Sequence, residues 1–272
     1  MTCSSSRALL GLILLAATLG SSPTRAWSQV RPFVFSLVPR SPAGPAWSMS
    51  GDVAYGRHLF SALGPEELEQ RVGAEVRLGG RITAVAQAGW AATGGSPSQV
   101  TAQLEVLDNL GPRGNGAVLA VGLGAMRDYS ATAVALGRII GGWRWRHALL
   151  VANVRLEHPF ANRGEISPRD ALDFNTSVGF VHDLSPSIRI GIESVAEDLE
   201  GLVESDEAEG GAKVMLGPTL SVGRPSSHWG AGLSAGPVLR LSQSSIPAAS
   251  GAGRELSQPG GFIVRTSVSY AW

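Results

Sequence analysis

The segment GFIVRTSVSYAW, residues 261–272, alternates two kinds of side chain up to the last residue of the sequence. Every second position is apolar, aromatic or threonine, and mostly small or polar residues stand between; the first set is Phe262, Val264, Thr266, Val268, Tyr270 and Trp272. A period of two residues predicts a β-strand with one apolar face. Because most soluble domains end in a few polar, frayed residues, this pattern predicts that the final tryptophan belongs to a sheet.

The same period recurs along the chain from residue 47 onward. In residues 69–80, valine, alanine and leucine alternate with glycine, glutamate and arginine, and in residues 187–194 three isoleucines alternate with arginine, glycine and glutamate. Counting such segments gives twelve predicted strands, with ten or fourteen as alternatives. Residues 131–146 also predict a strand, but the sequence does not assign its two faces. The pattern favours an all-β fold, an antiparallel up-and-down β-barrel that crosses a membrane.

The connections between the predicted strands alternate in length, as the loops of such a barrel do. The short ones are residues 79–80, 146–147, 183–187 and 224–228, and the long ones are residues 159–169, 197–211 and 243–260. Two connections fit this alternation poorly, because residues 109–116 form a long turn and residues 127–130 a short loop. The alternation predicts short periplasmic turns and longer outer loops.

The N-terminal region predicts export from the cytoplasm. Arg7 precedes an apolar run at residues 8–20, and small residues up to position 26 offer a cleavage site, which together are typical of a signal peptide over residues 1–26. Residues 27–46 contain several prolines, which argue against a central strand. We expect this part to form a periplasmic or plug segment, and residues 47–272 to form the barrel.

The C-terminal segment resembles the last strand of bacterial outer-membrane β-barrel proteins. The residues that carry the match are Phe262, Val264, Val268, Tyr270 and Trp272, with tryptophan at the end where phenylalanine is commoner. The resemblance implies a location in the bacterial outer membrane, surrounded by outer-membrane lipid. It also implies that the barrel-assembly machinery recognises this strand. A soluble β-sandwich is the alternative, and the signal peptide, the loop lengths and aromatic residues at both predicted strand ends favour the barrel.

The polar faces of the predicted strands supply the candidate lumen-lining residues. These are Glu75, Arg77, Gln103, Glu105, Arg155, Glu157, Asp173, Asn175, Arg189, Glu193, Arg240 and Arg265. Arg155, Asp173, Arg189 and Glu193 fall on neighbouring strands, where opposite charges can pair. Two interpretations follow: a closed barrel held by salt bridges, or a narrow polar pore. The sequence favours a narrow passive channel for small polar solutes or ions, with a structural or surface-interaction barrel as the alternative.

Other chemistry finds little support in the sequence. Net charge is zero and no basic stripe appears, so we expect no nucleic-acid partner. His58 and His158 fall near the outer rim with Ser167, as in an outer-membrane lipid hydrolase, but no nucleophile motif accompanies them; we expect no enzyme and no cofactor. The acidic loop 197–209 matches no calcium-loop spacing. We expect a solvated loop there and no metal site, and the sequence predicts no oligomeric state.

Overall fold

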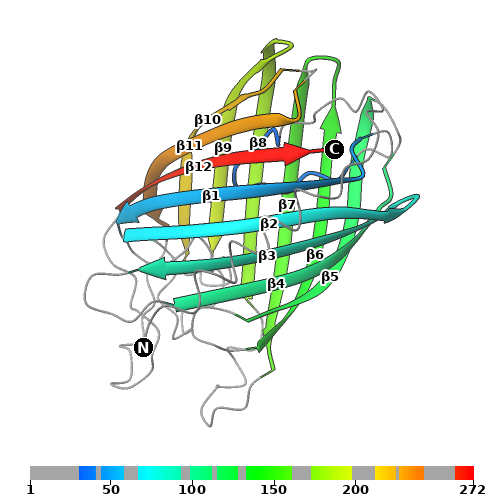
Figure 1. Cartoon of the computed structure of the whole chain (residues 1–272). Helices are drawn as coiled ribbons and strands as arrows, with labels where there is room; N and C mark the ends of the chain where they lie inside the picture. Colours follow the sequence, from blue (N-terminus) through cyan, green and yellow to red (C-terminus); the bar gives the residue numbers. More distant parts are fainter. Residues whose placement is uncertain are drawn as a thin grey trace, which may run out of the picture.

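The structure, a computed structural model, describes residues 31–40, 44–57, 67–92, 99–111, 115–127, 133–160, 173–197, 212–224, 227–241 and 261–272. Within these ranges the chain forms twelve strands, each antiparallel to its neighbours in one closed barrel (Figure 1). The predicted fold and its strand number are confirmed. Among the described residues, no helix has the length and apolar character that a membrane-spanning helix needs. The predicted signal peptide lies outside the described residues.

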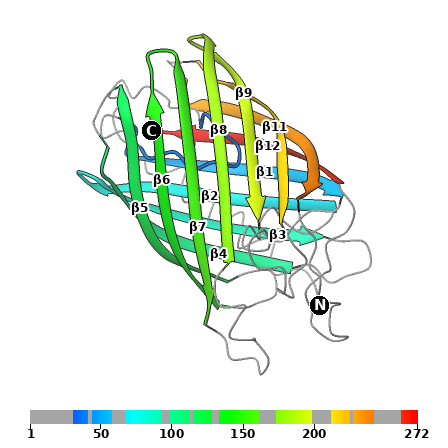
Figure 2. The same cartoon turned by 180° about the vertical axis from the view of Figure 1, so that it is seen from behind.

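Strands follow one another around the barrel in chain order, as the up-and-down topology requires. Their bounds are Trp47–Arg57 (β1), Glu67–Gly79 (β2), Ile82–Ala92 (β3), Gln99–Asn109 (β4), Gly116–Arg127 (β5), Ala133–Arg144 (β6), Ala148–Pro159 (β7), Asp173–Ser185 (β8), Ile188–Glu197 (β9), Lys213–Val222 (β10), Trp229–Arg240 (β11) and Gly261–Ala271 (β12). Strands on one side of the barrel cross those on the other side at a steep angle (Figures 1 and 2). Such tilt is what closure of a sheet into a barrel demands.

The first and last strands close the barrel. β1 pairs with β12 from Ser48 opposite Ala271 to Arg57 opposite Phe262. Beyond this ladder, the backbone N–H of Trp47 donates to the carbonyl of Trp272 at 3.3 Å, and the reverse bond measures 3.1 Å. The terminal tryptophan is therefore part of the sheet, and no strand edge is left in the barrel for lipid to meet.

Short connections gather at one end of the barrel, which we call the short-turn end; the opposite end is the loop end. β2 and β3 are joined through Gly79 and Gly80, and Gly80 has a φ of +23°, a conformation that side chains disfavour. β6 and β7, and β8 and β9, are likewise joined by two or three residues at this end. The predicted tight turns at these three positions are confirmed.

Apolar side chains cover the outside of the barrel. Leu123 is 76% exposed, and other large apolar residues are exposed on the outer faces of every strand except β3, which presents alanines there. A soluble monomer rarely exposes an apolar patch larger than a few hundred Å². An apolar belt around a closed sheet is the surface that a lipid bilayer requires.

Aromatic rings mark both ends of this apolar belt. At the short-turn end Tyr270 lies between Trp229 and Trp272, with both ring-centroid distances at 4.8 Å. At the loop end Tyr55 of β1 faces Phe262 of β12 at 6.1 Å. Aromatic girdles at the two membrane interfaces are typical of outer-membrane barrels, and they set the depth at which the lumen crosses the bilayer.

Candidate functional site: the barrel lumen

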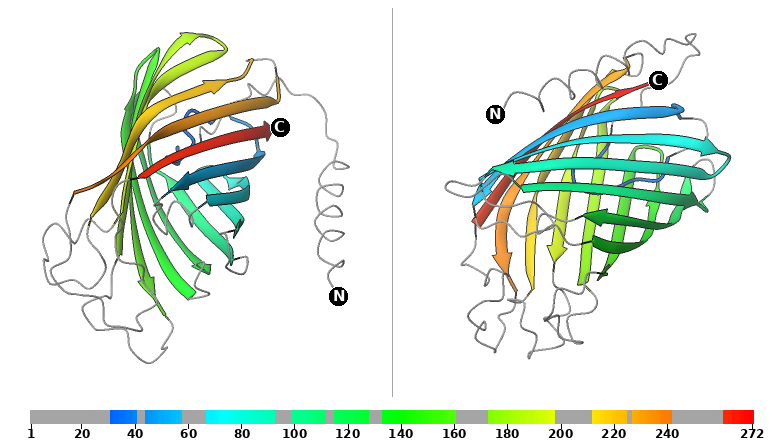
Figure 3. Two further views of the ribbon diagram at one scale, coloured as in Figure 1. Left: turned by 90° about the vertical axis from the view of Figure 1, so that its left-hand side faces the viewer. Right: turned by 60° about the horizontal axis from the view of Figure 1, so that its bottom comes forward.

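The lumen contains a segment of the chain itself. Residues 31–40, which we call the inner segment, run inside the ring of strands without joining the sheet (Figures 1 and 3). Phe33, Val34 and Ser36 are at most 3% exposed. The inner segment therefore fills part of the space that the wall encloses.

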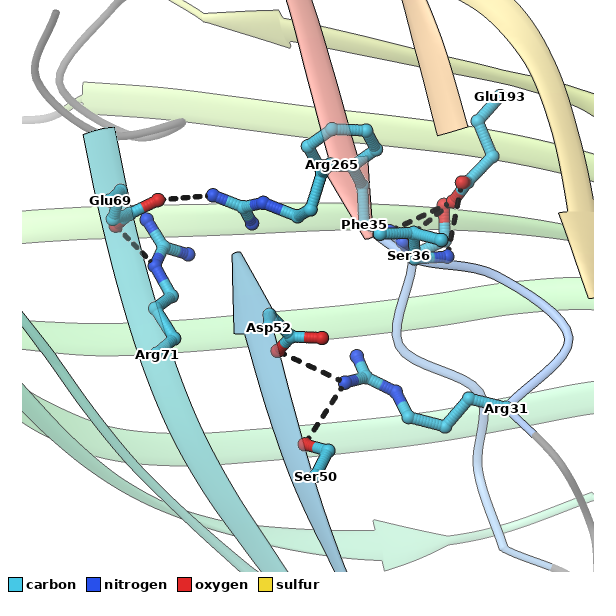
Figure 4. Close-up of polar contacts among 10 residues, drawn as sticks. Arg31, Phe35, Ser36, Ser50, Asp52, Glu69, Arg71, Glu193 and Arg265 are labelled. Carbon is cyan, nitrogen blue, oxygen red and sulfur yellow. Dashed lines mark hydrogen bonds and ion pairs between the residues drawn. The ribbon is translucent and has the colours of Figure 1, made fainter. Parts of the chain in front are cut away.

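Glu193 of β9 holds the middle of the inner segment. Its carboxylate accepts hydrogen bonds from three consecutive backbone N–H groups: Oε2 from Val34 at 3.1 Å, and Oε1 from Phe35 at 3.1 Å and from Ser36 at 3.0 Å (Figure 4). The Glu193 side chain is fully buried. A buried carboxylate needs donors, and backbone N–H groups outside a sheet need acceptors. This contact satisfies both needs at once.

An apolar patch of the wall receives Phe33 and Leu37. It is formed by inward side chains of β3 to β8, namely Val85, Leu107, Ala120, Ile140, Leu149, Val151 and Val181. The ring of Phe33 lies directly over Gly179, where a Cβ atom would come within 2.5 Å of it. Burial of each large apolar side chain contributes roughly 1.5–3 kcal/mol, so the patch is a substantial part of what holds the segment.

Two arginines tie the ends of the inner segment to the first two strands. Arg31 Nη1 lies 3.4 Å from Ser50 Oγ and 3.7 Å from Asp52 Oδ2 (Figure 4). Arg40 Nε donates to Glu75 Oε2 at 2.6 Å, and its other nitrogens bond to Ser48 and to the carbonyl of Pro45. The segment is thus bound to the barrel along its whole described length.

The inner wall carries paired charges beside the segment. Glu69 is 1% exposed and accepts from Arg71 Nε at 2.5 Å and from Arg265 (Figure 4). The Arg265 guanidinium also lies 4.9 Å from the ring centroid of Phe35, within range of a cation–π interaction. The closed barrel places these three charges together although β2 and β12 are far apart in sequence.

Further pairs occupy the wall formed by β4 to β9. Arg138 Nε lies 2.7 Å from Glu105 Oε1, and Arg189 Nε lies 2.8 Å from Asp183 Oδ1. Arg155 pairs with Glu157 on its own strand, and Asn175 Nδ2 donates to Glu157 at 2.8 Å. Pairing of this kind keeps buried charges compensated.

Two cavities lie at different depths, with the inner segment between them. The short-turn cavity has about 190 Å³ and is lined by Arg40, Glu75 and Arg144, among others. The central cavity has about 90 Å³ and is lined by Gln103, Asn153 and Asn175, among others. Arg31 and Leu37 line both. Both cavities have charged residues in their lining, and the inner segment contributes to both.

Nearly all of the predicted lumen residues sit on inward positions. Glu75 and Arg189 line the short-turn cavity, and a larger set lines the central cavity, namely Gln103, Glu105, Arg155, Asn175 and Arg265. Glu157 and Glu193 are buried, Asp173 is half-buried, and Arg77 Nη1 donates to the carbonyl of Gly44 at 3.0 Å. The backbone of Arg240 pairs with Lys213, and its side chain lies outside the described residues. That these residues line a conducting path stays a prediction.

Charge pairs on the described wall form both across strands and within one strand. Arg189 does pair across strands, with Asp183 of β8. Arg155, however, pairs with Glu157 of the same strand, and Glu193 bonds to the backbone of the inner segment. The donors to Glu193 are backbone N–H groups of the inner segment. A prediction that considers only the side chains of the wall does not include them.

Sequence reasoning missed the inner segment's contacts and the apolar patch. Leu107, Val151 and Val181 lie on faces predicted to be polar. The signal was present, because the alternation of polar and apolar residues fails near the short-turn ends of β4, β7 and β8. An apolar patch facing a lumen requires an apolar partner, and the Phe33–Leu37 stretch supplies it.

Several other predictions remain open. His58 and Ser167 lie outside the described residues, and so does nearly all of the acidic loop 197–209. No group of three metal-ligating side chains occurs among the described residues. Four residues of the predicted assembly signal lie on the outward face of β12, namely Phe262, Val264, Val268 and Tyr270, and the fifth, Trp272, directly follows this strand. Their recognition by the assembly machinery stays a prediction.

Comparisons with known proteins show the fold. No protein-family model and no curated protein matches the sequence. Among solved structures, the NanC porin superposes with a TM-score of 0.57 and 8% identity, over 82% of this chain and 100% of that one. The KdgM porin in complex with disordered oligogalacturonate gives a TM-score of 0.54 and 10% identity, over 83% and 99%. A second structure of the KdgM porin gives a TM-score of 0.53.

These likenesses agree with what the strands show by themselves. A closed, even-numbered antiparallel barrel with an apolar outer belt and aromatic ends is built for a bilayer. The predicted location in the bacterial outer membrane agrees with this surface and with the fold of these porins. The chain is a twelve-stranded β-barrel of the bacterial outer-membrane type.

Proposed function

We propose that this barrel is a narrow passive channel for small polar solutes or ions, and that the inner segment sets its width. The observation that carries the proposal is the pair of cavities at different depths, each lined in part by charged residues, which share Arg31 and Leu37 of the segment. Eight-stranded barrels have interiors filled by side chains, whereas barrels of 16 to 18 strands enclose an aqueous channel. Twelve strands fall between these sizes, so a ten-residue segment suffices to restrict passage.

The charges of the central cavity bear on which solutes would pass. Each arginine that lines this cavity has a carboxylate partner, and these arginines are Arg31, Arg71, Arg138, Arg155 and Arg265. A wall of compensated charges gives no track for a polyanion. The paired charges of this cavity therefore do not predict passage of a polyanion such as the oligogalacturonate of the KdgM porin complex.

A closed barrel that acts through its outer loops is the second candidate. The inner segment favours it, because the contacts of Glu193, Phe33 and Arg40 hold the segment across the lumen. Both candidates predict a stable barrel, and they differ in whether ions cross it.

Single-channel recording of the refolded protein in a planar bilayer separates the two. The passive-channel proposal predicts discrete current steps for the unaltered protein, and changed step size or ion selectivity in Arg155→Ala and Arg189→Ala. A variant that lacks residues 31–40 should give larger steps. A bilayer that stays silent for the unaltered protein, with a correctly folded barrel on an unheated gel, would contradict the channel and favour the closed barrel.

A further inference from the structure

The central cavity gathers buried polar atoms that have no hydrogen-bond partner. Asn153 of β7 is 3% exposed, and neither atom of its amide group has a partner among the described residues. Three further buried atoms lack a hydrogen-bond partner among the described residues: Asn175 Oδ1, Asp52 Oδ1 and Arg155 Nε. The residues that carry them line the same cavity as Asn153. Buried polar atoms without partners are rare in native proteins. Five of them around one space give it hydrogen-bonding positions for a polar molecule.

The chemistry of these atoms specifies the guest. Arg155 Nε and the Asn153 Nδ2 group donate, whereas the three Oδ1 atoms accept. Because both amide atoms of Asn153 lack partners, this balance does not depend on which way the amide is turned. A molecule that both donates and accepts at close spacing carries O–H groups, as water and hydroxylated solutes do. An anion would offer acceptors only, and a cation donors only.

Both apolar and charged residues surround Asn153. Asn153 lies between Val151, which belongs to the apolar patch, and Arg155, which belongs to the charged wall. Val34, Phe35 and Leu37 of the inner segment also line the cavity. The space therefore combines apolar surface with hydrogen-bonding groups, as the faces and edges of a sugar or polyol require. Its volume of about 90 Å³ exceeds the roughly 10–15 Å³ that one water needs.

We propose that the central cavity is a binding site for neutral, hydroxyl-rich solutes such as pentoses and small polyols, with Asn153 as its main contact. The proposal rests on the channel function proposed above and names the solute class of that channel. Losing a hydrogen bond in the site corresponds to roughly a threefold to tenfold change in the rate of passage.

Liposome swelling tests the site with two uncharged or net-neutral probes. Arabinose is rich in hydroxyls, whereas betaine has no hydrogen-bond donor. Asn153→Leu keeps the size of the side chain and removes its donor and acceptor. We expect arabinose-driven swelling to fall threefold to tenfold, while betaine-driven swelling and ion conductance change less than twofold. Asn153→Ser, which replaces the amide with a single hydroxyl group, should give an intermediate rate.

Ser221→Ala serves as the matched control. Ser221 of β10 is also buried, faces the lumen and has a hydroxyl without a partner, but it does not line the central cavity. Its replacement should leave the ratio of arabinose to betaine swelling unchanged.

The outcomes separate this inference from the channel proposal. If the unaltered protein conducts ions and Asn153→Leu leaves the ratio unchanged, the cavity holds structural water only and the inference fails alone. Equal losses for both probes and for conductance would mean simple occlusion and would also overturn it. If the unaltered protein gives neither conductance nor swelling, the channel proposal fails and the solute class fails with it.

Discussion

Replacing Glu193 with alanine should release the inner segment from the wall. The variant removes the acceptor of three backbone N–H bonds, from Val34, Phe35 and Ser36. Hydrogen bonds to a charged group contribute roughly 1.5–3 kcal/mol each, and contributions at one carboxylate do not add fully. We expect the bound state of the segment to lose about 3 kcal/mol against a released state whose N–H groups bind water. A change of this size shifts the equilibrium constant between the bound and released states on the order of a hundredfold.

A single thiol in the segment reports this equilibrium. The sequence has one cysteine, Cys3, so Cys3→Ser leaves Ser36→Cys as the only thiol. Ser36 is 2% exposed, and its side chain lines the short-turn cavity without a hydrogen-bond partner, so the replacement disturbs little. The rate at which a charged, membrane-impermeant thiol reagent modifies this position follows the released fraction. It should rise on the order of a hundredfold in Glu193→Ala.

Two further variants make the measurement specific. Glu157→Ala removes another buried lumen carboxylate, one that bonds to Arg155 and Asn175 and not to the segment, and the modification rate should stay within a few fold of its original value. Glu193→Gln keeps one acceptor oxygen and should fall between. Equal rates in Glu193→Ala and the unaltered background, with the barrel folded in both, would refute the assigned role of this carboxylate.

The remaining predictions concern packing and assembly. Gly179→Val should displace the ring of Phe33, because a Cβ atom at this position would meet it at 2.5 Å, and overpacking of roughly 1–3 kcal/mol should raise the same thiol modification rate about tenfold. Gly141→Val is the control, since nothing lies within 4 Å of a Cβ there; an equal effect of both would contradict the contact. Trp272→Ala should lower the fraction of protein that reaches the heat-modifiable form in membranes, because alanine keeps the backbone bonds to Trp47 but loses the packing of the Trp272 ring on Tyr270. Trp143→Ala, an exposed aromatic of β6, should lower that fraction less, and an equal loss would count against a special role for the last residue.

Much of the barrel could be predicted because its outer surface leaves a regular trace in the sequence. Lipid favours apolar side chains, so most outward residues of β4 and β9 are apolar whatever the lumen contains, among them Leu104, Val106 and Ile190. Loop lengths then set the order of the strands. The faces of β6 stayed unassigned for a physical reason: Val134, Leu136 and Ile140 point inward, so both faces of this strand are apolar.

The lumen was less predictable because its contacts depend on chain closure. Glu69 and Arg265 form an ion pair across 196 residues, and Glu193 meets Val34 across 159. A pattern read strand by strand shows which residues face inward, but it does not show which of them meet. Most residues of the predicted list face inward, and their role along a conducting path stays a prediction.

The apolar patch argues that the inner segment is part of the folded barrel. Inward valine, leucine and isoleucine from β3 to β8 would face water if the lumen held solvent alone, and exposing such a group costs roughly 1.5–3 kcal/mol for each large side chain. The patch lies where Phe33 and Leu37 contact the wall, and Gly179 leaves the space that the Phe33 ring takes. If Glu193 alone held the segment, breaking its hydrogen bonds would suffice for release. Because the apolar patch also contacts the segment, release exposes apolar surface on both the segment and the wall. We therefore expect full opening to be rare without an opposing ligand or pull, and solutes to pass beside the segment more often than in its place.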